Sequence, residues 1–410
     1  MRVASSTQFG TVQTVIAPNY DFDTLPDRRN EGSIKWDMMQ AALGDDAAAG
    51  AFAVSTADMD FVMAPEIIAA LRESAERRIY GYTGPTNAYY DAVIHWMQRR
   101  HNWPVAQESI ALAPGIVAAI YYTLYAMTQP GDGVITQPPV YAPFAKSVRH
   151  TGRELLLNPL VNEGGRYVID FDDLEAKASQ KHAKMLILCS PHNPVGRVWQ
   201  RNELEQIADI CLRRNVFILS DEIHFDIVFP PHKHTVFATL DRELLDRCIV
   251  CTSPSKTFNI AGMQISNIMI TNRELREKFV RASHTCGFET PNCLAYDACQ
   301  AAYNNAEPWL EALLAYLSAN DRVTREYFAE RRLPVTISPL EATYLQWLDF
   351  SALGLGHTEL QRLMQKKAGV FFEEGTVFGD EGRCFERLNF ACPRSVVREI
   401  ACRVGRAITA

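Results

Sequence analysis

The sequence predicts an α/β protein built on a largely parallel β-sheet. Four short apolar runs typical of buried strands occur along the middle of the chain, at residues 133–137, 184–190, 215–220 and 248–252. Between two of them, residues 201–214 carry apolar side chains at helical spacing. A strand, a helix and a second strand in this order form a parallel β-α-β unit, so we expect helices to cover the sheet.

Composition favours an enzyme that acts on a small molecule. The 410 residues are 47% hydrophobic and 22% charged, enough for a large core and more than one domain. The formal net charge is −7 and basic residues do not cluster among aromatic ones, so we expect neither nucleic acid nor membrane as a partner. No stretch approaches the roughly 18 apolar residues of a membrane span, and the N-terminal residues lack a sustained apolar segment. We therefore expect a cytoplasmic protein.

Three parts of the chain differ in pattern. Residues 1–48 show little regularity, and we expect an arm that packs on the smaller domain or on a second subunit. Residues 49–295 contain the β-α-β pattern and should form the large domain. Residues 296–410 begin with a long helical stretch through Arg331 and continue with alternating strands at 342–348 and 385–390. They predict a smaller α+β domain.

The cysteine and histidine pattern does not predict a metal site. Ten cysteines are spread along the chain, many among apolar residues, as expected of reduced and buried thiols. Cys248 and Cys251 lie in a strand pattern, with no second pair at zinc-binding spacing. His232 and His234 follow two prolines, in what we interpret as a solvated loop.

Polar residues follow the predicted strands where a ligand is expected. Ser190, Asp221 and Ser253 come directly after three of the strands, and ligands of such sheets bind beyond the carboxyl ends of the strands. A carboxylate beside a buried strand must be paired with a cation. For Asp221 this partner would be a cationic ligand, or the carboxylate would have a structural role in a salt bridge or helix cap. Lys256 lies among small hydroxyl residues just beyond. It is either a surface lysine or an amine with a covalent or phosphate-binding role.

Gly115 precedes an apolar helical run that begins at Ile116. The free N–H groups and the dipole at a helix N-terminus favour a phosphate, although a Pro-Gly pair before a helix is often a simple turn. The order of these features along the chain favours a functional interpretation.

A series of short motifs runs in order through most of the chain. They are Asp27-Arg-Arg29, Ser33-Ile-Lys-Trp-Asp37, Ala57-Asp-Met-Asp-Phe61, Gly81-Tyr-Thr83, Pro114-Gly-Ile116, Pro139-Val-Tyr-Ala-Pro-Phe144, Cys189-Ser-Pro-His-Asn-Pro-Val-Gly-Arg197, Ser220-Asp-Glu-Ile-His224, Pro254-Ser-Lys-Thr-Phe-Asn259 and Arg387-Leu-Asn-Phe-Ala-Cys-Pro-Arg394. In these motifs the chain resembles the fold-type I pyridoxal-phosphate enzymes, and among them the C–S lyase branch of the MalY/PatB type. The resemblance implies an aminotransferase-like fold whose large domain has a mostly parallel, seven-stranded sheet.

The resemblance also implies a pyridoxal 5'-phosphate cofactor and residues that bind it. Lys256 would hold the cofactor covalently and move the α-proton of the substrate, Asp221 would pair with the ring nitrogen, and Tyr141 would stack on the ring. Asn193 and His224 would hydrogen-bond the ring oxygen. Phosphate binding is implied for Gly115, Ile116, Ser253 and Ser255, together with Tyr82 from a second subunit. A homodimer with a shared active site is therefore expected.

For the substrate, the resemblance implies binding by Arg387, Asp58 and Asn193, with the guanidinium gripping the α-carboxylate. The implied activity is β-elimination from L-cystathionine or a related cysteine S-conjugate, giving a thiol, pyruvate and ammonia. Gln264 stands where the commoner aminotransferase pattern has an arginine, which favours the lyase branch. Two alternatives stay open: an aminotransferase on the same scaffold, and a regulatory protein that binds the cofactor.

One departure from the lyase pattern concerns residues 371–374, where relatives usually have smaller, neutral side chains. Here the sequence is Phe-Phe-Glu-Glu. Glu373 or Glu374 would select a substrate side chain that carries a cation or hydrogen-bond donors, or both glutamates would lie in a solvated loop. The sequence leaves both interpretations open.

Overall fold

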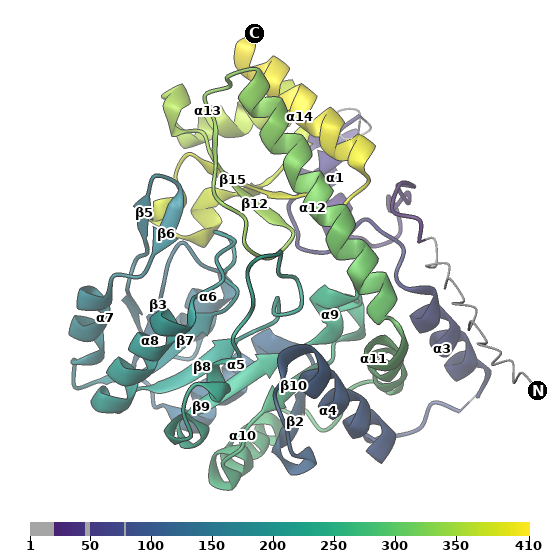
Figure 1. Ribbon diagram of the computed structural model, residues 1–410. Coiled ribbons are helices and arrows are strands. Elements are labelled where there is room, and N and C mark those ends of the chain that lie inside the picture. The colour runs from purple at the N-terminus through teal and green to yellow at the C-terminus, as the bar shows by residue number, and fades with distance from the viewer. Residues whose placement is uncertain (1–19, 46–49, 78) are drawn as a thin grey trace, which may run out of the picture.

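The computed structural model describes residues 20–45, 50–77 and 79–410. Figure 1 shows a broad lower part around the central sheet and a narrower upper part around β12, β15 and α14. The long helix α12 (Glu307–Glu330) runs from one part to the other. Its position agrees with the helical stretch predicted after residue 295.

The central sheet has seven strands in the order β2-β10-β9-β8-β7-β3-β4. Their bounds are β2 (Ile110–Ala113), β10 (Ser266–Met269), β9 (Cys248–Thr252), β8 (Phe217–Asp221), β7 (Ala183–Cys189), β3 (Gly133–Thr136) and β4 (Glu154–Leu157). The five strands from β9 to β4 are parallel, whereas β10 is antiparallel to both of its neighbours. The four strands predicted from apolar runs are all confirmed.

Alternate residues of the central strands enter different cores, as the two-residue period of a strand requires. Met185 and Ile187 face a cluster with helices α5 (Ile116–Met127), α6 (Pro143–His150) and α10 (Arg273–Thr285). Leu186 and Leu188 face the larger cluster on the other side of the sheet. The helices contributing to this larger core include α3 (Pro65–Glu76), α4 (Asn87–His101), α7 (Phe171–Ala178), α8 (Arg201–Arg214) and α11 (Cys293–Asn305). The predicted helix over residues 201–214 is thus confirmed, and both faces of the sheet are covered.

A smaller antiparallel sheet has the order β11-β12-β15-β14. Its strands are β11 (Thr336–Ile337), β12 (Leu345–Asp349), β15 (Phe385–Asn389) and β14 (Glu373–Glu374), and the helices α13 (His357–Arg362) and α14 (Arg394–Thr409) belong to the same stretch of chain. Two further strand pairs are β1 (Phe52–Ala53) with β13 (Val370–Phe371), and β5 (Val161–Glu163) with β6 (Arg166–Val168). The pairing of β1 with β13 joins an early segment of the chain to a late one.

Part of the N-terminal segment is more regular than its sequence indicated. Residues Ile34–Leu43 form the helix α1, whose Trp36, Met39 and Leu43 pack on Ala51 and Ala53. The expectation of little regular structure over residues 1–48 is wrong for this stretch, and residues 1–19 and 46–49 lie outside the described part of the chain. The predicted domain boundaries stay predictions, and α11 spans residue 295.

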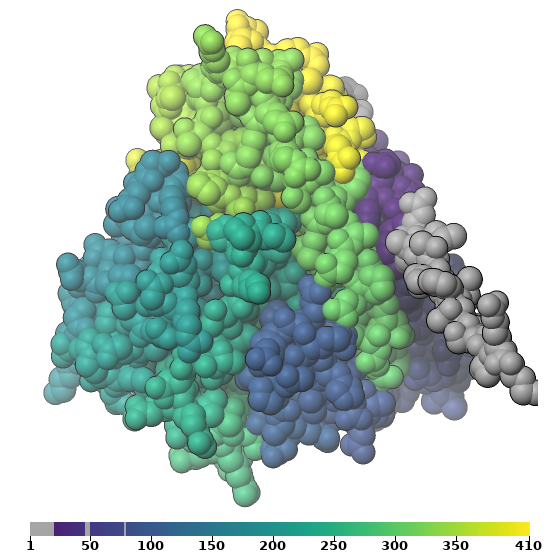
Figure 2. Space-filling view, in the orientation of Figure 1, coloured from purple at the N-terminus to yellow at the C-terminus, as the bar shows by residue number. Residues whose placement is uncertain are grey.

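The two ends of the long helix α12 are fixed differently. Near its start, Arg99 and Arg100 of α4 pair with Glu307 at 2.7 and 3.2 Å, and Figure 2 shows the surfaces of these two helices meeting. Further along, α12 packs on α14.

Within the described residues, no helix is both long enough and apolar enough to cross a membrane.

Candidate active site

Three parallel strands end together beside a cavity of about 560 Å³. The last residues of β7 and β8, Cys189 and Asp221, are paired in register, and Asp221 is paired with Cys251 of β9. The cavity wall also includes Thr56 and Ala57 from the segment after β1 and Arg387 from the smaller sheet. The cavity therefore lies between the two parts of the molecule, at the edge where the sequence predicted a ligand.

Ten of the twelve residues that the sequence assigned to the site line this cavity. They are Gly115, Ile116, Tyr141, Asn193, Asp221, His224, Ser253, Ser255, Lys256 and Arg387. Gln264 and Glu373, which were singled out as departures from related sequences, line it as well. Asp58 and Tyr82 do not.

Lys256 lies on the short helix α9 (Pro254–Thr257), which follows β9 directly. Its Nζ donates a hydrogen bond to the carbonyl oxygen of Ala57 at 2.5 Å. Burial lowers the pKa of Lys256 to about 8, against the attraction of Asp58 and with help from the positive charge of Arg387. A substantial fraction of this amine is neutral near physiological pH, as a nucleophile or base requires.

Asp221, the last residue of β8, is only 4% exposed. Its Oδ1 accepts a hydrogen bond from the Ile223 N–H at 3.1 Å, and it takes part in none of the ion pairs found among the described residues. Burial raises its pKa to about 7, despite that hydrogen bond, and the nearby charge of Glu222 contributes to the rise. A buried carboxylate in this state favours a cationic group in the cavity beside it.

His224 and Tyr141 present further polar groups to the cavity. Burial lowers the pKa of His224 to about 3, and the charges of Lys256 and Arg387 act in the same direction, so its imidazole is neutral. The buried Nδ1 of His224 has no hydrogen-bond partner within the described part of the chain. Burial raises the pKa of Tyr141, whose ring packs edge-on against Phe144. Both side chains therefore offer hydrogen-bonding atoms without carrying a charge.

Another part of the cavity lining is formed by a glycine turn and two serines. Gly115 caps α5 with φ +114°, a conformation that favours glycine, and a Cβ there would meet no atom within 4 Å. Ser253 caps α9 and its Oγ donates to the Ile265 carbonyl at 2.7 Å. Free helix N–H groups, hydroxyls and open space suit a phosphate.

Arg387 lies on β15 and is 3% exposed. Its Nη2 donates to the Ser55 carbonyl at 2.6 Å and its Nη1 to Asn193 Oδ1 at 3.1 Å, while its guanidinium lies 4.9 Å from the ring centre of Phe378. Its buried Nε has no hydrogen-bond partner in residues 20–45, 50–77 and 79–410. These contacts hold a fixed positive charge whose remaining donor capacity suits a carboxylate.

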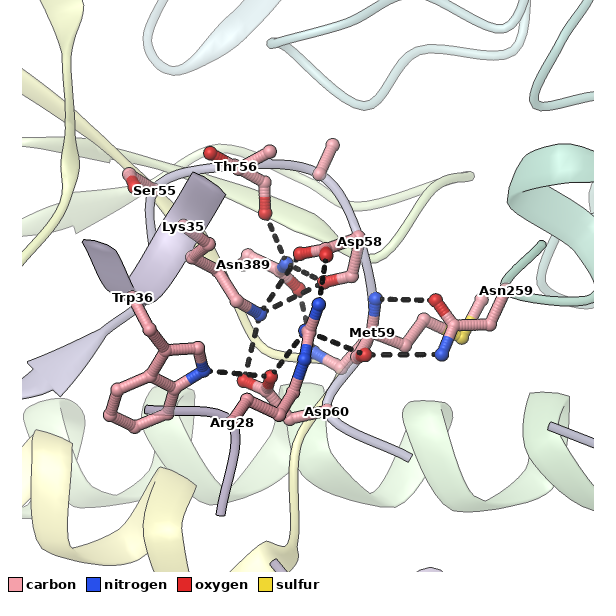
Figure 3. A network of polar contacts seen from close by, with 12 residues as sticks. Arg28, Lys35, Trp36, Ser55, Thr56, Asp58, Met59, Asp60, Asn259 and Asn389 are labelled. Carbon is pink, nitrogen blue, oxygen red and sulfur yellow. Dashed lines mark hydrogen bonds and ion pairs between the residues drawn. The ribbon is translucent and has the colours of Figure 1, made fainter. Parts of the chain in front are cut away.

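Asp58 does not line the cavity, and its predicted contact with the substrate stays a prediction. Figure 3 shows Asp58 in a partly buried polar network, where Oδ2 lies 2.7 Å from Arg28 Nη2 and Oδ1 lies 3.2 Å from Lys35 Nζ. Burial would raise the pKa of Asp58, but Lys35 and Arg28 lower it overall. Its carboxylate is thus neutralised away from the cavity, and its effect on Lys256 is electrostatic.

The same network fixes the segment that faces Lys256. Asp60 binds Lys35 at 2.7 Å, Arg28 at 2.9 Å and the Trp36 indole N–H at 3.2 Å. Asn259 exchanges hydrogen bonds with the backbone of Met59. Residues from α1 and from the loop after α9 therefore hold the backbone that accepts the lysine hydrogen bond.

Two other predicted residues lie elsewhere. The side chain of Tyr82 is fully exposed and away from the cavity of its own chain, so its predicted contribution to a second subunit stays a prediction. His234 was expected in a solvated loop, but its side chain is 3% exposed and its Nε2 lies 2.7 Å from Glu222 Oε2. The buried glutamate explains why this histidine is drawn inward.

Some groups in the site were not identified from sequence. The carbonyl oxygens of Ser55 and Ala57 accept from Arg387 and Lys256, and Phe378 packs against the guanidinium. Every residue has a backbone carbonyl, so the sequence does not show which of them accept hydrogen bonds in the site. The motif Ala57-Asp-Met-Asp-Phe61 was the available signal, although its contribution here lies in the backbone and not in the Asp58 side chain.

A family model described as aminotransferase class I and II matches residues 52–404. The chain belongs to this family. Within it, cystathionine beta-lyase PatB of Bacillus subtilis is 41% identical over 95% of this chain and 100% of its own. The crystal structure of cystalysin from Treponema denticola, which contains a pyridoxal 5'-phosphate cofactor, is 40% identical with a TM-score of 0.92, covering 96% of this chain and 99% of the other. The structure of a pyridoxal-phosphate-bound C–S lyase from Staphylococcus hominis is 32% identical with a TM-score of 0.88 over the same shares. These matches confirm the predicted aminotransferase-like fold and the resemblance to the lyase branch.

Proposed function

We propose that this protein is a pyridoxal-phosphate-dependent C–S β-lyase that cleaves L-cystathionine or a related cysteine S-conjugate to a thiol, pyruvate and ammonia. One observation carries the proposal: a partly buried lysine, a buried carboxylate without an ion-pair partner among the described residues, and a buried arginine line one cavity at the strand ends. The 41% identity to a cystathionine β-lyase over nearly the whole chain supports the lyase branch of the family.

The side chains of the cavity suit this cofactor at each of its ends. Lys256 would hold it covalently, Asp221 would pair with its cationic ring nitrogen, and Tyr141 would lie on its ring. Asn193 and the neutral His224 would bind its ring oxygen. Its phosphate would be bound by the N–H groups at Gly115 and Ile116 and by the hydroxyls of Ser253 and Ser255. When bound, pyridoxal phosphate supplies the electron sink that stabilises negative charge on the substrate Cα.

The residues of the chain orient the substrate and move its proton. Arg387 would bind the α-carboxylate, because its guanidinium is held by Asn193 and the Ser55 carbonyl while Nε stays free. Once the substrate amine has replaced it on the cofactor, the free Lys256 amine would accept the Cα proton, a role that its lowered pKa favours. Loss of thiolate from Cβ leaves an enamine, which water converts to pyruvate and ammonia.

We also propose a cytoplasmic homodimer in which Tyr82 of one subunit reaches the phosphate of the other. The side chain of Tyr82 and those of its neighbours Ile79 and Tyr80 are exposed on the single chain, which is consistent with a surface that a second copy covers. Sedimentation of the purified protein tests the dimer. A monomer that retains full activity would contradict it.

The function is tested by measuring absorbance and pyruvate release with S-substituted cysteines. Lys256→Ala should lose the visible absorbance of the bound cofactor and all turnover, whereas Lys278→Ala, on the exposed side of α10, should keep both. Pyruvate formed without a keto-acid acceptor supports the lyase. Amino transfer to a keto acid in stoichiometric amount, without pyruvate from the cysteine conjugate, would instead establish the aminotransferase alternative.

A further inference from the structure

The structure separates two adjacent glutamates that the sequence could not distinguish. Glu373 and Glu374 form the short strand β14, which pairs with β15 so that Glu373 lies opposite Arg387 and Glu374 opposite Glu386. Because successive side chains of a strand point to opposite faces, the two glutamates face different surroundings. Glu373 lines the cavity that contains Lys256 and Asp221. Glu374 does not, and its Oε2 lies 3.1 Å from His357 Nε2.

Glu373 is the negative group nearest to Arg387. Its Oε2 lies 3.5 Å from Arg387 Nη2, and its side chain is 23% exposed whereas that of Arg387 is 4% exposed. The guanidinium is therefore held at the inner end of the contact and the carboxylate at the more open end. Glu373 contributes no other ion pair or side-chain hydrogen bond among the described residues.

A substrate bound through its α-carboxylate would change this balance. Arg387 carries one positive charge and would then face two carboxylates, that of the substrate and that of Glu373. The substrate carboxylate and a partly buried Glu373 would repel each other unless a second cation is present. A cation carried by the substrate beyond its sulfur atom would supply it, if that part of the substrate extends toward the more exposed carboxylate of Glu373.

We propose that Glu373 is a specificity-determining residue that favours cysteine S-conjugates carrying an ammonium group beyond the sulfur. This inference depends on the proposed C–S lyase function and adds a substrate class to it. L-Cystathionine belongs to this class through the ammonium of its second amino-acid group, which also carries a carboxylate and is therefore neutral overall. Neutral S-alkyl cysteines lack this partner, and conjugates with a distal carboxylate but no distal ammonium add a third negative charge.

Three conjugates of similar size test the charge preference: S-(2-aminoethyl)-L-cysteine, S-propyl-L-cysteine and S-(2-carboxyethyl)-L-cysteine. The loaded enzyme should rank them in that order by kcat/KM for pyruvate release. Glu373→Gln should lower kcat/KM for the aminoethyl compound about tenfold, mainly through KM, because a contact remote from the reacting bond binds ground and transition states alike. It should raise kcat/KM for the carboxyethyl compound and change that of the propyl compound by less than about twofold.

Two matched variants separate this role from a structural one. Glu374→Gln, one residue away but outside the cavity, should keep the wild-type ranking, and Glu373→Asp, which keeps the charge, should restore most of it. Equal changes for all three conjugates in Glu373→Gln would overturn the inference, since they would mean that the glutamate only competes for Arg387. Wild-type turnover without any charge ranking would also overturn it and leave the lyase function standing. A lack of pyruvate from every conjugate would overturn the lyase function and this inference with it.

Discussion

Replacing Asp221 by Asn should make the cofactor-free protein more stable while removing its activity. In the wild-type chain the carboxylate is 4% exposed, and burial raises its pKa to about 7 from the ordinary 3.8. Its ionised form is therefore disfavoured in the folded state relative to the unfolded state. An amide keeps the hydrogen bond from Ile223 through its oxygen, but it never carries the charge.

The sign and the pH window follow from proton binding in the two states. Below about pH 4 the carboxyl is protonated in both states, so it does not affect stability. Between about pH 4 and pH 7 the unfolded chain releases this proton and the folded chain keeps it, so stability falls as the pH rises. Above about pH 7 the loss is complete and constant. At about 1.4 kcal/mol per pH unit, wild type loses at most on the order of 4 kcal/mol of stability over this range. The gain in stability of Asp221→Asn is smaller than this, because burying the amide also has a desolvation cost.

Thermal unfolding of the cofactor-free proteins from pH 4 to pH 8 measures this difference. The midpoint of Asp221→Asn should exceed that of wild type by a margin that grows to about pH 7 and then stays constant. Asp380→Asn, at a side chain that is 97% exposed, serves as the control and should show no such trend. Addition of pyridoxal phosphate should stabilise wild type more than Asp221→Asn, because only the carboxylate offers a charge to a cationic ring. A variant that is no more stable than wild type at pH 8, or a margin independent of pH, would refute this reasoning.

Further variants test the packing around the site. Lys35→Met should lower the free energy of unfolding by about 3 kcal/mol in denaturant titrations, because it removes one of the cations that neutralise Asp58 and Asp60. The control Arg273→Ala, in an exposed ion pair on α10, should lower it by less than about 0.5 kcal/mol. An equal effect of both substitutions would contradict the buried network. Gly382→Ala should lower the melting temperature by several degrees, because the added Cβ would collide with the carbonyl oxygen of Gly375. The control Gly50→Ala, whose Cβ would meet no described atom within 4 Å, should leave the melting temperature almost unchanged.

The central sheet was predictable because its strands are buried on both faces. Residues 184–190 and 248–252 are continuous apolar runs, and the strands observed are Ala183–Cys189 and Cys248–Thr252. The helix between β7 and β8 has the same bounds as its apolar period, Arg201–Arg214. Each pattern depends on local sequence, and each was therefore visible without any knowledge of distant contacts.

Helix α1 was missed because one of its buried positions is a lysine. Trp36, Met39 and Leu43 form an apolar face, but Lys35 is also buried, at 1% exposed, and breaks the apolar period. Its burial depends on Asp60, which is far along the chain. His234 was predicted to be exposed for a similar reason. Its partner, Glu222, lies twelve positions earlier in the sequence, so the residues next to His234 do not indicate that its side chain is buried. A charged or polar residue whose partner is remote in sequence cannot be assigned to the interior from its neighbours alone.

Two sets of buried polar groups in and beside the site have different tasks. Lys35 and Asp60 are buried and paired with opposite charges within the chain, so they hold the backbone in place. Asp221, His224 and Arg387 are also buried, and all three line one cavity. Among the described residues, Asp221 has no ion-pair partner, and His224 Nδ1 and Arg387 Nε have no hydrogen-bond partner. A chain that left these groups incomplete for no ligand would lose stability without compensation. Together with Lys256, these three groups match a ligand with a cationic ring, hydrogen-bonding oxygens and a carboxylate, which is the combination that a cofactor–amino acid complex presents.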